Sequence, residues 1–487
     1  MQRISMNNFS KDIGIIHFIG IGGIGMSGIA EILFNLGYKI SGSDISKSTN
    51  VERLMKMGIK VFIGQSAKNI KNISIIVISS AIKEDNVELV AGYLNKIPIV
   101  RRADMLAELM RFKKSISVGG SHGKTTTTSF ISSLLEGAKL DPTVVNGGII
   151  EAYGTNARLG KSDWMVVEAD ESDGTFIKLP STYVLITNID REHIDYYKTF
   201  DNLNRAFRNF VENIPFYGTA FICIDSPDSE NLCKDIKYRN FITFGFNKNA
   251  HLVVNNVKVI SGLTYFDITV NKKDLYKNKF IKGLAIPIPG EHNIRNALGS
   301  IAVALELGIS ETIIRNVLLN FSGVERRFSF VGSFKGIKII DDYAHHPTEI
   351  KNTLKAARSL CKDKLIVIFE PHRYSRIIDL YDEFINSFFD ADILYVTKIY
   401  SAGENKIDEI NENILAKSIR DMGHKNVKCF KDESNMELEL FEAADNNDFI
   451  IFLGAGSLSK RARNMEKFVK KKLITCYVEK ILIYATI

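Results

Sequence analysis

Short apolar runs recur along the chain and alternate with segments of helical character. The runs are rich in isoleucine, valine and phenylalanine, and eight of them stand at residues 13–20, 72–80, 115–120, 163–170, 182–189, 337–344, 364–370 and 448–456. Helical segments follow several of the runs, at residues 25–37, 125–139 and 346–360. Strands that are apolar throughout are buried on both faces, in parallel sheets that helices cover. The pattern therefore predicts an α/β fold.

Three strand-glycine-helix units divide the chain, and they begin near Gly14, Ser115 and Gly336. A length of 487 residues corresponds to about three domains at roughly 150 residues each. We therefore expect each unit to open a domain of its own. The predicted domains are residues 1–112, 113–325 and 326–487.

Two segments stand outside this alternation. Residues 254–270 alternate between apolar and polar positions around a Ser-Gly pair, which predicts a β-hairpin inserted in the second domain. The tail after about residue 462 joins a basic run to apolar residues, and we expect a helix or a strand packed on the last domain, with a helix on a membrane surface as the alternative. Because its apolar part is shorter than the ~20 residues that span a bilayer, no membrane span is predicted.

Composition narrows the class of protein. Hydrophobic residues make up 45% of the chain and charged residues 24%, which excludes a disordered or a coiled-coil protein. Five cysteines without a C-x-x-C pair predict reduced thiols, and because no export signal is found we expect a cytoplasmic protein. The net charge of +7 suits anionic small molecules. No basic stripe with interleaved aromatic residues appears, so no nucleic-acid partner is expected.

A glycine loop follows the first apolar run. Gly20, Gly22 and Gly25 match G-x-G-x-x-G between a strand and a helix, and Asp44 follows where a ribose-binding carboxylate would lie. Glycines let the backbone approach a diphosphate, whose charge the helix N-terminus favours. The loop alone is compatible with NAD, FAD or a sugar nucleotide. His17, in the strand before the loop, is expected to be a core histidine bonded to the backbone.

A second glycine loop lies within residues 115–130 and carries a lysine and a run of threonines. Lys124 is placed to neutralise the β- and γ-phosphates of a nucleoside triphosphate, and the Thr125 hydroxyl to bind Mg²⁺. The loop departs from the general G-x-x-x-x-G-K-[ST] pattern, because Val118 stands at the first glycine position. We expect it to cradle a triphosphate nonetheless.

Polar residues end two later apolar runs. Glu168 ends one of them, and Asp190 and His193 follow another. The carboxyl ends of parallel strands meet at the sheet edge where the phosphate loop also lies. We therefore expect Glu168 and His193 to converge with Thr125 on Mg²⁺. A helix cap or an ion pair is the alternative role for these side chains.

Seven ordered motifs together resemble those of the Mur ligases. They are GGSHGKTTTT, VEADESD, NIDREHIDYY, GEHNIRNAL, GVERRF, DDYAHHPTEI and PHRYSR, and the resemblance runs from about residue 13 to about residue 461. It implies a Rossmann-like first domain that binds a UDP-sugar and a central domain that binds ATP. It also implies a Rossmann-like third domain that closes over the ATP.

The resemblance implies roles for individual residues as well. The ATP-binding positions would be Gly120, Ser121, His122, Gly123, Lys124, Thr125, Thr126, Asn293, Asn296, Arg327 and Asp342. The UDP-sugar positions would be Gly20, Gly22, Gly23, Gly25, Asp44, Ser79 and Ser80. The Mg²⁺ ligands would be Thr125, Glu168 and His193, the substrate contacts His345 and His372, and the catalytic residues Lys124, His193, Arg373 and Arg376.

Three positions depart from the family pattern. They are Ser121, Glu192 and Glu370, where threonine, aspartate and glutamine are usual. None of these departures removes a metal or phosphate ligand. Glu370 adds a negative charge near an anionic site, so we expect its side chain to point away or to pair with an arginine.

Two residue pairs near the third domain's predicted site leave alternatives open. His345 and His346 precede a helix, so they bind the substrate or else cap and pack that helix. Arg373 and Arg376 are three positions apart and would share a helix face if their segment is helical. That face would contact the substrates or else be a solvated basic face.

The activity implied by the resemblance is an ATP-dependent ligation. The protein would use ATP and Mg²⁺ to join L-alanine to the carboxylate of UDP-N-acetylmuramate through an acyl phosphate, in peptidoglycan precursor synthesis, as a monomer or weak homodimer. A sister ligase that adds a murein tripeptide to the same sugar nucleotide stays open, because the ATP-site motifs do not separate the two. An NAD-dependent oxidoreductase would leave the Lys124 loop unused. A non-catalytic nucleotide sensor would not need the intact set of ligands.

Overall fold

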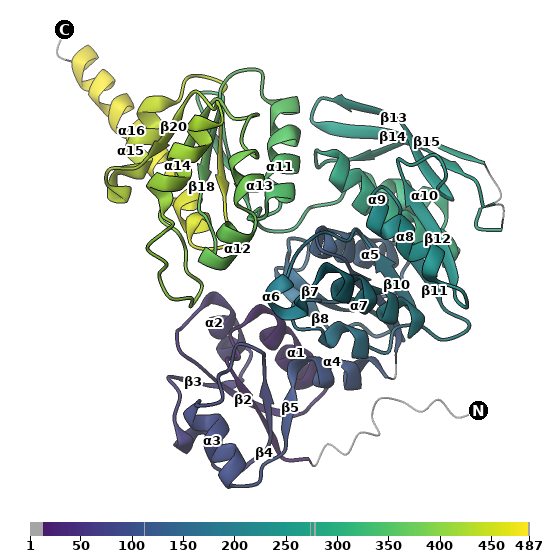
Figure 1. Ribbon diagram of the computed structural model, residues 1–487. Helices are drawn as coiled ribbons and strands as arrows, with labels where there is room; N and C mark the ends of the chain where they lie inside the picture. Colours follow the sequence, from purple (N-terminus) through teal and green to yellow (C-terminus); the bar gives the residue numbers. More distant parts are fainter. Residues whose placement is uncertain (1–12, 112, 273, 277–278, 486–487) are drawn as a thin grey trace. The chain divides into compact units, whose positions relative to one another are not determined.

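Three β-sheets flanked by helices make up the protein (Figure 1). The computed structural model describes residues 13–111, 113–272, 274–276 and 279–485, with side chains as far as residue 472. Parallel strand pairs predominate in each sheet. The predicted α/β class, with a sheet at the centre of each third of the chain, is confirmed.

The first sheet has five parallel strands in the order β3-β2-β1-β4-β5. Its strands are β1 Ile15–Ile19, β2 Lys39–Asp44, β3 Lys60–Ile63, β4 Ile73–Ile78 and β5 Ile99–Arg101. Its helices are α1 Ile24–Asn35, α2 Thr49–Lys56, α3 Val87–Leu94 and α4 Arg102–Met110, with a 3₁₀ turn η2 at Ala67–Ile70. Strand order reverses between β1 and β4, and open α/β sheets bind ligands at such a switch point.

The second sheet has ten strands in the order β15-β14-β13-β12-β11-β10-β6-β9-β7-β8. Its strands are β6 Lys114–Gly119, β7 Thr143–Ile150, β8 Thr155–Arg158, β9 Trp164–Glu168, β10 Tyr183–Ile186, β11 Thr219–Cys223, β12 Asn240–Gly245, β13 Leu252–Ile260, β14 Leu263–Val270 and β15 Phe280–Ile286. Its helices are α5 Lys124–Gly137, α6 Ile194–Tyr197, α7 Phe200–Glu212, α8 Pro227–Asp235, α9 Glu291–Glu306 and α10 Glu311–Leu319, with a 3₁₀ turn η3 at Thr175–Lys178. Strands β6, β9 and β10 are parallel neighbours, so their carboxyl ends lie at one edge.

The predicted hairpin is formed by β13 and β14. Ser261 and Gly262 make its turn with φ values of 51° and 82°, a region that glycine adopts without strain. The hairpin extends the second sheet beyond β12, to which β13 pairs in parallel.

The third sheet has six strands in the order β16-β17-β21-β18-β19-β20. Its strands are β16 Ser329–Phe334, β17 Ile337–Asp342, β18 Leu365–Phe369, β19 Ile393–Val396, β20 Val427–Cys429 and β21 Phe449–Leu453. Its helices are α11 Pro347–Leu360, α12 Tyr374–Asp379, α13 Tyr381–Ile385, α14 Glu412–Asp421, α15 Met436–Ala443 and α16 Leu458–Ala485, with a 3₁₀ turn η4 at Glu433–Asn435. Strand β16 is antiparallel to β17, and the other pairs are parallel.

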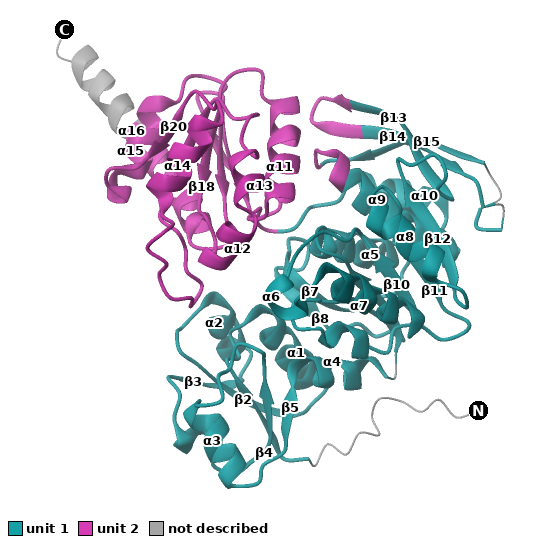
Figure 2. Cartoon of the chain, in the orientation of Figure 1, with its two compact units in different colours: residues 1–258, 265–287, 293–324 teal, residues 259–264, 288–292, 325–487 magenta. Residues whose placement is uncertain are grey.

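Two compact units group these sheets (Figure 2). The first unit holds the first sheet and most of the second, and the second unit holds the third sheet. Short pieces of the middle of the chain, at residues 259–264 and 288–292, group with the second unit. The domain boundaries at 112/113 and 325/326 stay predictions.

The tail forms a helix, which is one of the two alternatives predicted for it. Leu458, Ala462, Met465 and Val469 are buried against the third sheet, at the spacing of one helix face. The prediction that the tail packs on the last part of the chain is therefore confirmed as far as Val469.

Two predictions made from composition concern the thiols and the membrane. Cys223, Cys233, Cys361 and Cys429 are free, as expected of reduced thiols, and Cys476 lies outside the side chains that the structure describes. Along the described part of the chain, no helix has the length and apolar character needed to cross a bilayer.

Candidate functional site

The second glycine loop lies between the end of β6 and the start of α5. Gly120 and Gly123 have φ values of 124° and 83°, which a side chain would strain. A Cβ on Gly123 would lie 2.4 Å from Oδ1 of Asn296, and the amide of Asn296 lies 3.4 Å from Oδ1 of Asn293. The structure thus brings the loop together with Asn293 and Asn296, which the resemblance assigns to ATP binding.

Lys124 is the first residue of α5 and is almost buried, with 13% of its side chain exposed. Its Nζ donates to the carbonyl oxygens of Gly120 at 2.7 Å and Ser121 at 3.0 Å, and to Oε1 of Glu171 at 3.0 Å. Burial alone would lower the pKa of Lys124, but the charges of Glu171, Glu192 and nearby carboxylates outweigh it and raise the pKa. The ammonium group is therefore charged and held in place at the mouth of the loop.

Carboxylates and an imidazole lie next to this ammonium group. Nε2 of His193 is 3.7 Å from Oε1 of Glu171 and 3.9 Å from Oε1 of Glu192. The ligand atoms of the three side chains all lie within 4.8 Å of one another. Burial acts to raise the pKa of Glu171, and the positive charge of Lys124 opposes it.

Two of these three residues were missed by the sequence analysis as site residues. Glu171 stands three positions after Glu168, and Glu192 was noted only as a departure from a family pattern. A signal for Glu171 existed, because carboxylates at 168, 170 and 171 directly follow the buried strand β9. The sequence did not indicate which of them would face the lysine.

Glu168 and Thr125 lie beside a pair of glycines in β7. The backbone N–H of Gly147 donates to Oε2 of Glu168 at 2.7 Å. A Cβ on the next residue, Gly148, would lie 2.9 Å from Cγ2 of Thr125. Of the predicted Mg²⁺ ligands, His193 belongs to the cluster with Glu171, and Glu168 and Thr125 lie along these glycines.

Ser121 and His122 fix the loop to the segment that follows β10. The hydroxyl of Ser121 donates to the carbonyl oxygen of Asp190 at 3.2 Å, so serine makes this contact where threonine is usual. Nε2 of His122 lies 3.1 Å from Oδ2 of Asp190. Thr126 is buried in the first turn of α5.

The first glycine loop is held by backbone and carboxylate oxygens at the end of β2. The N–H groups of Gly20 and Ile21 donate to the carbonyl oxygen of Ser43 at 2.8 and 2.9 Å. The N–H of Gly22 donates to Oδ2 of Asp44 at 2.8 Å, and that of Gly23 to the carbonyl oxygen of Gly20 at 3.1 Å. The donors that can receive an anion are therefore the N–H groups of the first turn of α1.

Asp44 has a structural task in addition to any ribose contact. A Cβ on Gly22 would lie 2.8 Å from its Oδ2, so glycine is required there for the close approach of the carboxylate. The loop after β4 places Ser79 and Ser80 beyond the end of the strand, where the carbonyl oxygen of Ser79 accepts from Ile82.

His17 is buried, as predicted, but its partners are side chains and not the backbone. Nδ1 lies 2.9 Å from Oγ of Ser41, and Nε2 lies 3.5 Å from Oε2 of Glu88. The expectation of a backbone partner was wrong because neighbouring strand carbonyls are used in the parallel sheet, which leaves the ring to side chains from β2 and α3.

Asp342 ends β17 and holds the loop that contains Arg327. Its carboxylate accepts from the N–H groups of Phe328 at 2.7 Å and Ala344 at 2.8 Å. Burial, opposed by Arg327, raises the pKa of Asp342 to about 6. Arg327 itself lies over the ring of Tyr343, with the guanidinium carbon 5.2 Å from the ring centroid.

The two adjacent histidines take different roles. His346 is the N-cap of α11, and its Nδ1 accepts from the N–H of Thr348 at 3.3 Å, which is the capping alternative. The ring of His345 lies 5.5 Å from that of His372, which in turn stacks on Tyr400 at 5.4 Å. Burial, reinforced by neighbouring arginines, lowers the pKa of His372 to about 4.

The condition under which Arg373 and Arg376 would share a helix face is not met, because Arg373 lies outside the helix. Helix α12 begins at Tyr374, and Arg373 precedes it with a φ of 68°. Nη1 of Arg376 lies 3.4 Å from Nδ1 of His372. The left-handed backbone at Arg373 sets its side chain apart from the helical residues.

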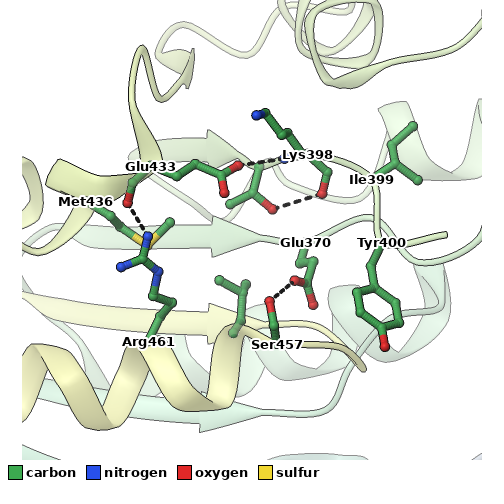
Figure 3. A pocket seen from close by; sticks show the side chains of 10 residues that line it. Glu370, Lys398, Ile399, Tyr400, Glu433, Met436, Ser457 and Arg461 are labelled. Atoms are coloured by element: carbon green, nitrogen blue, oxygen red, sulfur yellow. Dashed lines mark hydrogen bonds between the residues drawn. The ribbon is translucent and has the colours of Figure 1, made fainter. Parts of the chain in front are cut away.

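Glu370 does not pair with an arginine, contrary to one of the two expectations. Its Oε2 accepts from the hydroxyl of Ser457 at 2.7 Å, and its Oε1 is buried without a hydrogen-bond partner among the described residues. Figure 3 shows it between Ser457 and Tyr400, in the wall of a cavity of about 180 Å³. Burial raises its pKa. The start of α16 therefore supplies the partner that was expected from an arginine.

Comparisons with known proteins cover most of the chain. Three family models match it: "Mur ligase family, catalytic domain" at residues 15–114, "Mur ligase middle domain" at residues 118–304 and "Mur ligase, glutamate ligase domain" at residues 326–456. A UDP-N-acetylmuramate--L-alanine ligase of Rhizobium etli is 49% identical over 94% of this chain and 97% of its own. One of Chelativorans sp. is 50% identical over 94% of this chain and 98% of its own.

Solved structures show the same likeness. The UDP-N-acetylmuramate-alanine ligase of Thermotoga maritima has a TM-score of 0.80 at 28% identity and covers 94% of this chain and 100% of its own. A murein peptide ligase of Psychrobacter arcticus has a TM-score of 0.67 at 19% identity, covering 94% of this chain and 98% of its own. The second likeness concerns the fold alone.

Proposed function

Since the chain belongs to the Mur ligase family, we propose that it joins L-alanine to the carboxylate of UDP-N-acetylmuramate and converts ATP to ADP and phosphate. The observation that carries this proposal is the charged Lys124, held by the carbonyls of its glycine loop beside Glu171 and His193. That arrangement suits the transfer of a phosphoryl group. The relatives at about half identity are named for this ligation.

The chemistry explains why such a site is needed. A carboxylate is a poor electrophile, and transfer of the γ-phosphoryl group of ATP to it gives an acyl phosphate whose leaving group is phosphate. Phosphoryl transfer depends mostly on positioning and charge neutralisation. Lys124 neutralises the phosphates, and the N–H groups of the loop and of the first turn of α5 orient them. The amine of L-alanine then attacks the acyl carbon, and phosphate departs.

The residues present fit Mg²⁺. Glu171, Glu192 and His193 bring their ligand atoms within 4.8 Å of one another, and carboxylate oxygens are the ligands this ion prefers. Thr125 and Glu168 lie close by, along the glycines of β7. When bound, Mg²⁺ would supply positive charge to the phosphoryl group in transfer.

The third sheet supplies one uncharged and one cationic side chain for the substrates. With its pKa near 4, His372 is neutral at physiological pH and can accept a hydrogen bond. Arg376 lies against it and provides the positive charge for a carboxylate or phosphate. Asp342, as a positioning residue, binds the backbone N–H of Phe328, the residue that follows Arg327.

The first glycine loop is the proposed site of the UDP diphosphate. Its N–H groups from Gly20 to Gly23 are used within the protein, which leaves the first turn of α1 for the ligand. We assign Ser79 and Ser80 to the same site, because they follow β4 at the switch point of the sheet. We also propose that the protein acts in the cytoplasm, as a monomer or a weak homodimer.

The sister ligase that attaches a murein tripeptide is not favoured, because the relatives at about 50% identity are named for ligation of L-alanine. An oxidoreductase is not favoured either, because it gives no task to the cluster around Lys124.

Phosphate release by the purified protein tests the proposal. The assay combines Mg-ATP and UDP-N-acetylmuramate with no amino acid, L-alanine, glycine, L-serine or the L-Ala-γ-D-Glu-meso-diaminopimelate tripeptide. We expect release that requires both the sugar nucleotide and L-alanine, and that Lys124→Ala lowers by at least about 10³-fold. The exposed Lys161→Ala is the matched control and should retain full activity. Release with the tripeptide alone would move the assignment to the sister ligase, and no release would end the catalytic claim.

A further inference from the structure

A buried carboxylate lies behind the first glycine loop and takes no part in the site described so far. Glu88, near the start of α3, is fully buried. It accepts from the hydroxyl of Ser43 at 2.5 Å, from the amide of Asn69 at 2.6 Å and from the N–H of Ser66 at 3.1 Å. His17 lies 3.5 Å away on the strand that leads into the loop. Residues from β1, β2 and the segment of η2 thus meet at one side chain of α3.

Ser43 connects this carboxylate to the loop. Its hydroxyl binds Glu88, and its carbonyl oxygen accepts from the N–H groups of both Gly20 and Ile21. The next residue, Asp44, accepts from the N–H of Gly22. Any movement of the end of β2 would therefore move the loop and with it the first turn of α1.

The charge of Glu88 is maintained by its neighbours. Burial alone would raise its pKa, but the hydrogen bonds from His17, Ser43, Asn69 and Ser66 outweigh burial and lower the pKa. Buried charges of this kind give little net stability, since apolar residues of similar volume serve a core as well or better. They are effective at fixing one arrangement of the groups that bind them. The network is therefore better suited to holding the loop than to stabilising the sheet.

We propose that Glu88 is a positioning residue of the sugar-nucleotide site, acting through Ser43 to hold the glycine loop and the start of α1 in the geometry that receives the diphosphate. This inference rests on the proposed function, because it takes the first loop to be the UDP-sugar site. Glu88 does not touch the ligand. Its effect is expected in binding of the sugar nucleotide and not in the chemistry at Lys124.

The test compares Glu88→Gln with wild type in the full chain. We expect the Kd of UDP-N-acetylmuramate, measured by calorimetry, and its KM to rise about tenfold. The KM of ATP and the kcat at saturating sugar nucleotide should stay within about twofold. If Glu88 served only stability, the variant would have a lower thermal midpoint and a smaller active fraction. Its KM for the sugar nucleotide would then not change separately from its KM for ATP and its kcat. Glu84→Gln, on the exposed loop four residues earlier, is the matched control and should change neither constant.

Ser43→Ala provides a second variant that removes only the hydroxyl. It should weaken the binding of UDP-N-acetylmuramate to a similar extent. The double variant should bind the sugar nucleotide no more weakly than Glu88→Gln alone, because both changes break the same connection between Glu88 and Ser43. An unchanged Kd in both variants, or additive effects in the double variant, would overturn the inference.

The same measurements separate this inference from the proposed function. If wild type binds UDP-N-acetylmuramate but releases no phosphate, the ligase proposal fails and the Kd comparison still decides the role of Glu88. If wild type does not bind the sugar nucleotide, the inference about Glu88 fails as well.

Discussion

Lys124 and Glu171 form an ion pair at the centre of the proposed reactive site. The ammonium group lies 2.9 Å from Oε2 of Glu171, and both side chains are held by groups that do not belong to a substrate. Such preorganisation is what an electrostatic site needs, because no reorientation is then required during the reaction. His193, in the segment that follows β10, completes the cluster.

Replacing Glu171 by glutamine should impair the use of ATP. The change leaves Lys124 without its nearest counter-ion and removes one oxygen ligand from the cluster with Glu192 and His193. We expect kcat/KM for ATP to fall about 10- to 100-fold and the half-saturating Mg²⁺ concentration to rise. Steady-state phosphate release at several Mg²⁺ concentrations measures both. Activity equal to that of wild type would exclude Glu171 from the site.

The lowered pKa of His372 predicts that the stability of the protein depends on pH in the acid range. Its pKa is about 4 in the folded protein and about 6.5 in an unfolded chain. Between these values the unfolded chain binds more protons, so stability falls as the pH is lowered from 6.5 toward 4. Between pH 8 and pH 5 the thermal midpoint of His372→Gln should therefore fall less than that of wild type, by a few degrees. An identical pH dependence in the variant would contradict the assignment.

Residues next to a glycine or a strand end could be predicted, and those fixed by distant segments could not. The loop with Lys124 was found because its spacing is local. Glu171 was missed because its orientation depends on α5 and on the segment that follows β10. Glu88 was missed for the same reason, since its partners come from η2, β1 and β2.

At the scale of elements, β18 and α16 are joined by Glu370. The carboxylate binds Ser457 at the start of α16, and the residues that follow Glu370 are Pro371 and His372. A Cβ on Gly456 would lie 2.3 Å from Oε1 of Glu370, so glycine leaves room for the buried oxygen. This contact ties the segment with His372 to the last helix.

Glu370→Gln should stabilise the protein above acid pH. Burial raises the pKa of Glu370 in the folded state, so the folded protein binds the proton more tightly and loses stability as the pH rises above the unfolded value. Glutamine removes this cost and keeps a carbonyl oxygen that accepts from the hydroxyl of Ser457. We expect a thermal midpoint higher by about 2–4 °C at pH 8, the shift that ~1 kcal/mol produces, and a smaller gain at pH 5. A lower midpoint at pH 8 would show that the charge itself is stabilising.

Elements with a strong pattern were predicted well, and their ends were not. The strands around the two glycine loops and the hairpin at β13 and β14 follow from apolar runs and turn residues. The sequence did not indicate where α12 begins, because the N–H of Arg373 donates to the carbonyl oxygen of Tyr400 in the segment that follows β19. Contacts of that kind join residues far apart in the chain.

At the scale of the whole molecule, the proposed function assigns one part of the chemistry to each sheet. The proposed sugar-nucleotide loop belongs to the first sheet, Lys124 and its cluster belong to the second, and His372 and Arg376 belong to the third. The α/β class and the three sheets were predictable from the alternation of apolar runs and helices. The grouping of residues 259–264 and 288–292 with the second unit was not, because it depends on contacts between distant segments.

The route of oxygen tests the central claim, which is ligation through an acyl phosphate. UDP-N-acetylmuramate labelled with ¹⁸O in both carboxylate oxygens is incubated with the full chain, Mg-ATP and L-alanine, and the phosphate and the amide product are analysed by mass spectrometry. We expect the released phosphate to carry one labelled oxygen and the amide to keep the other. Labelled amide without label in the phosphate would contradict the acyl phosphate, and the absence of any amide would contradict the ligation itself.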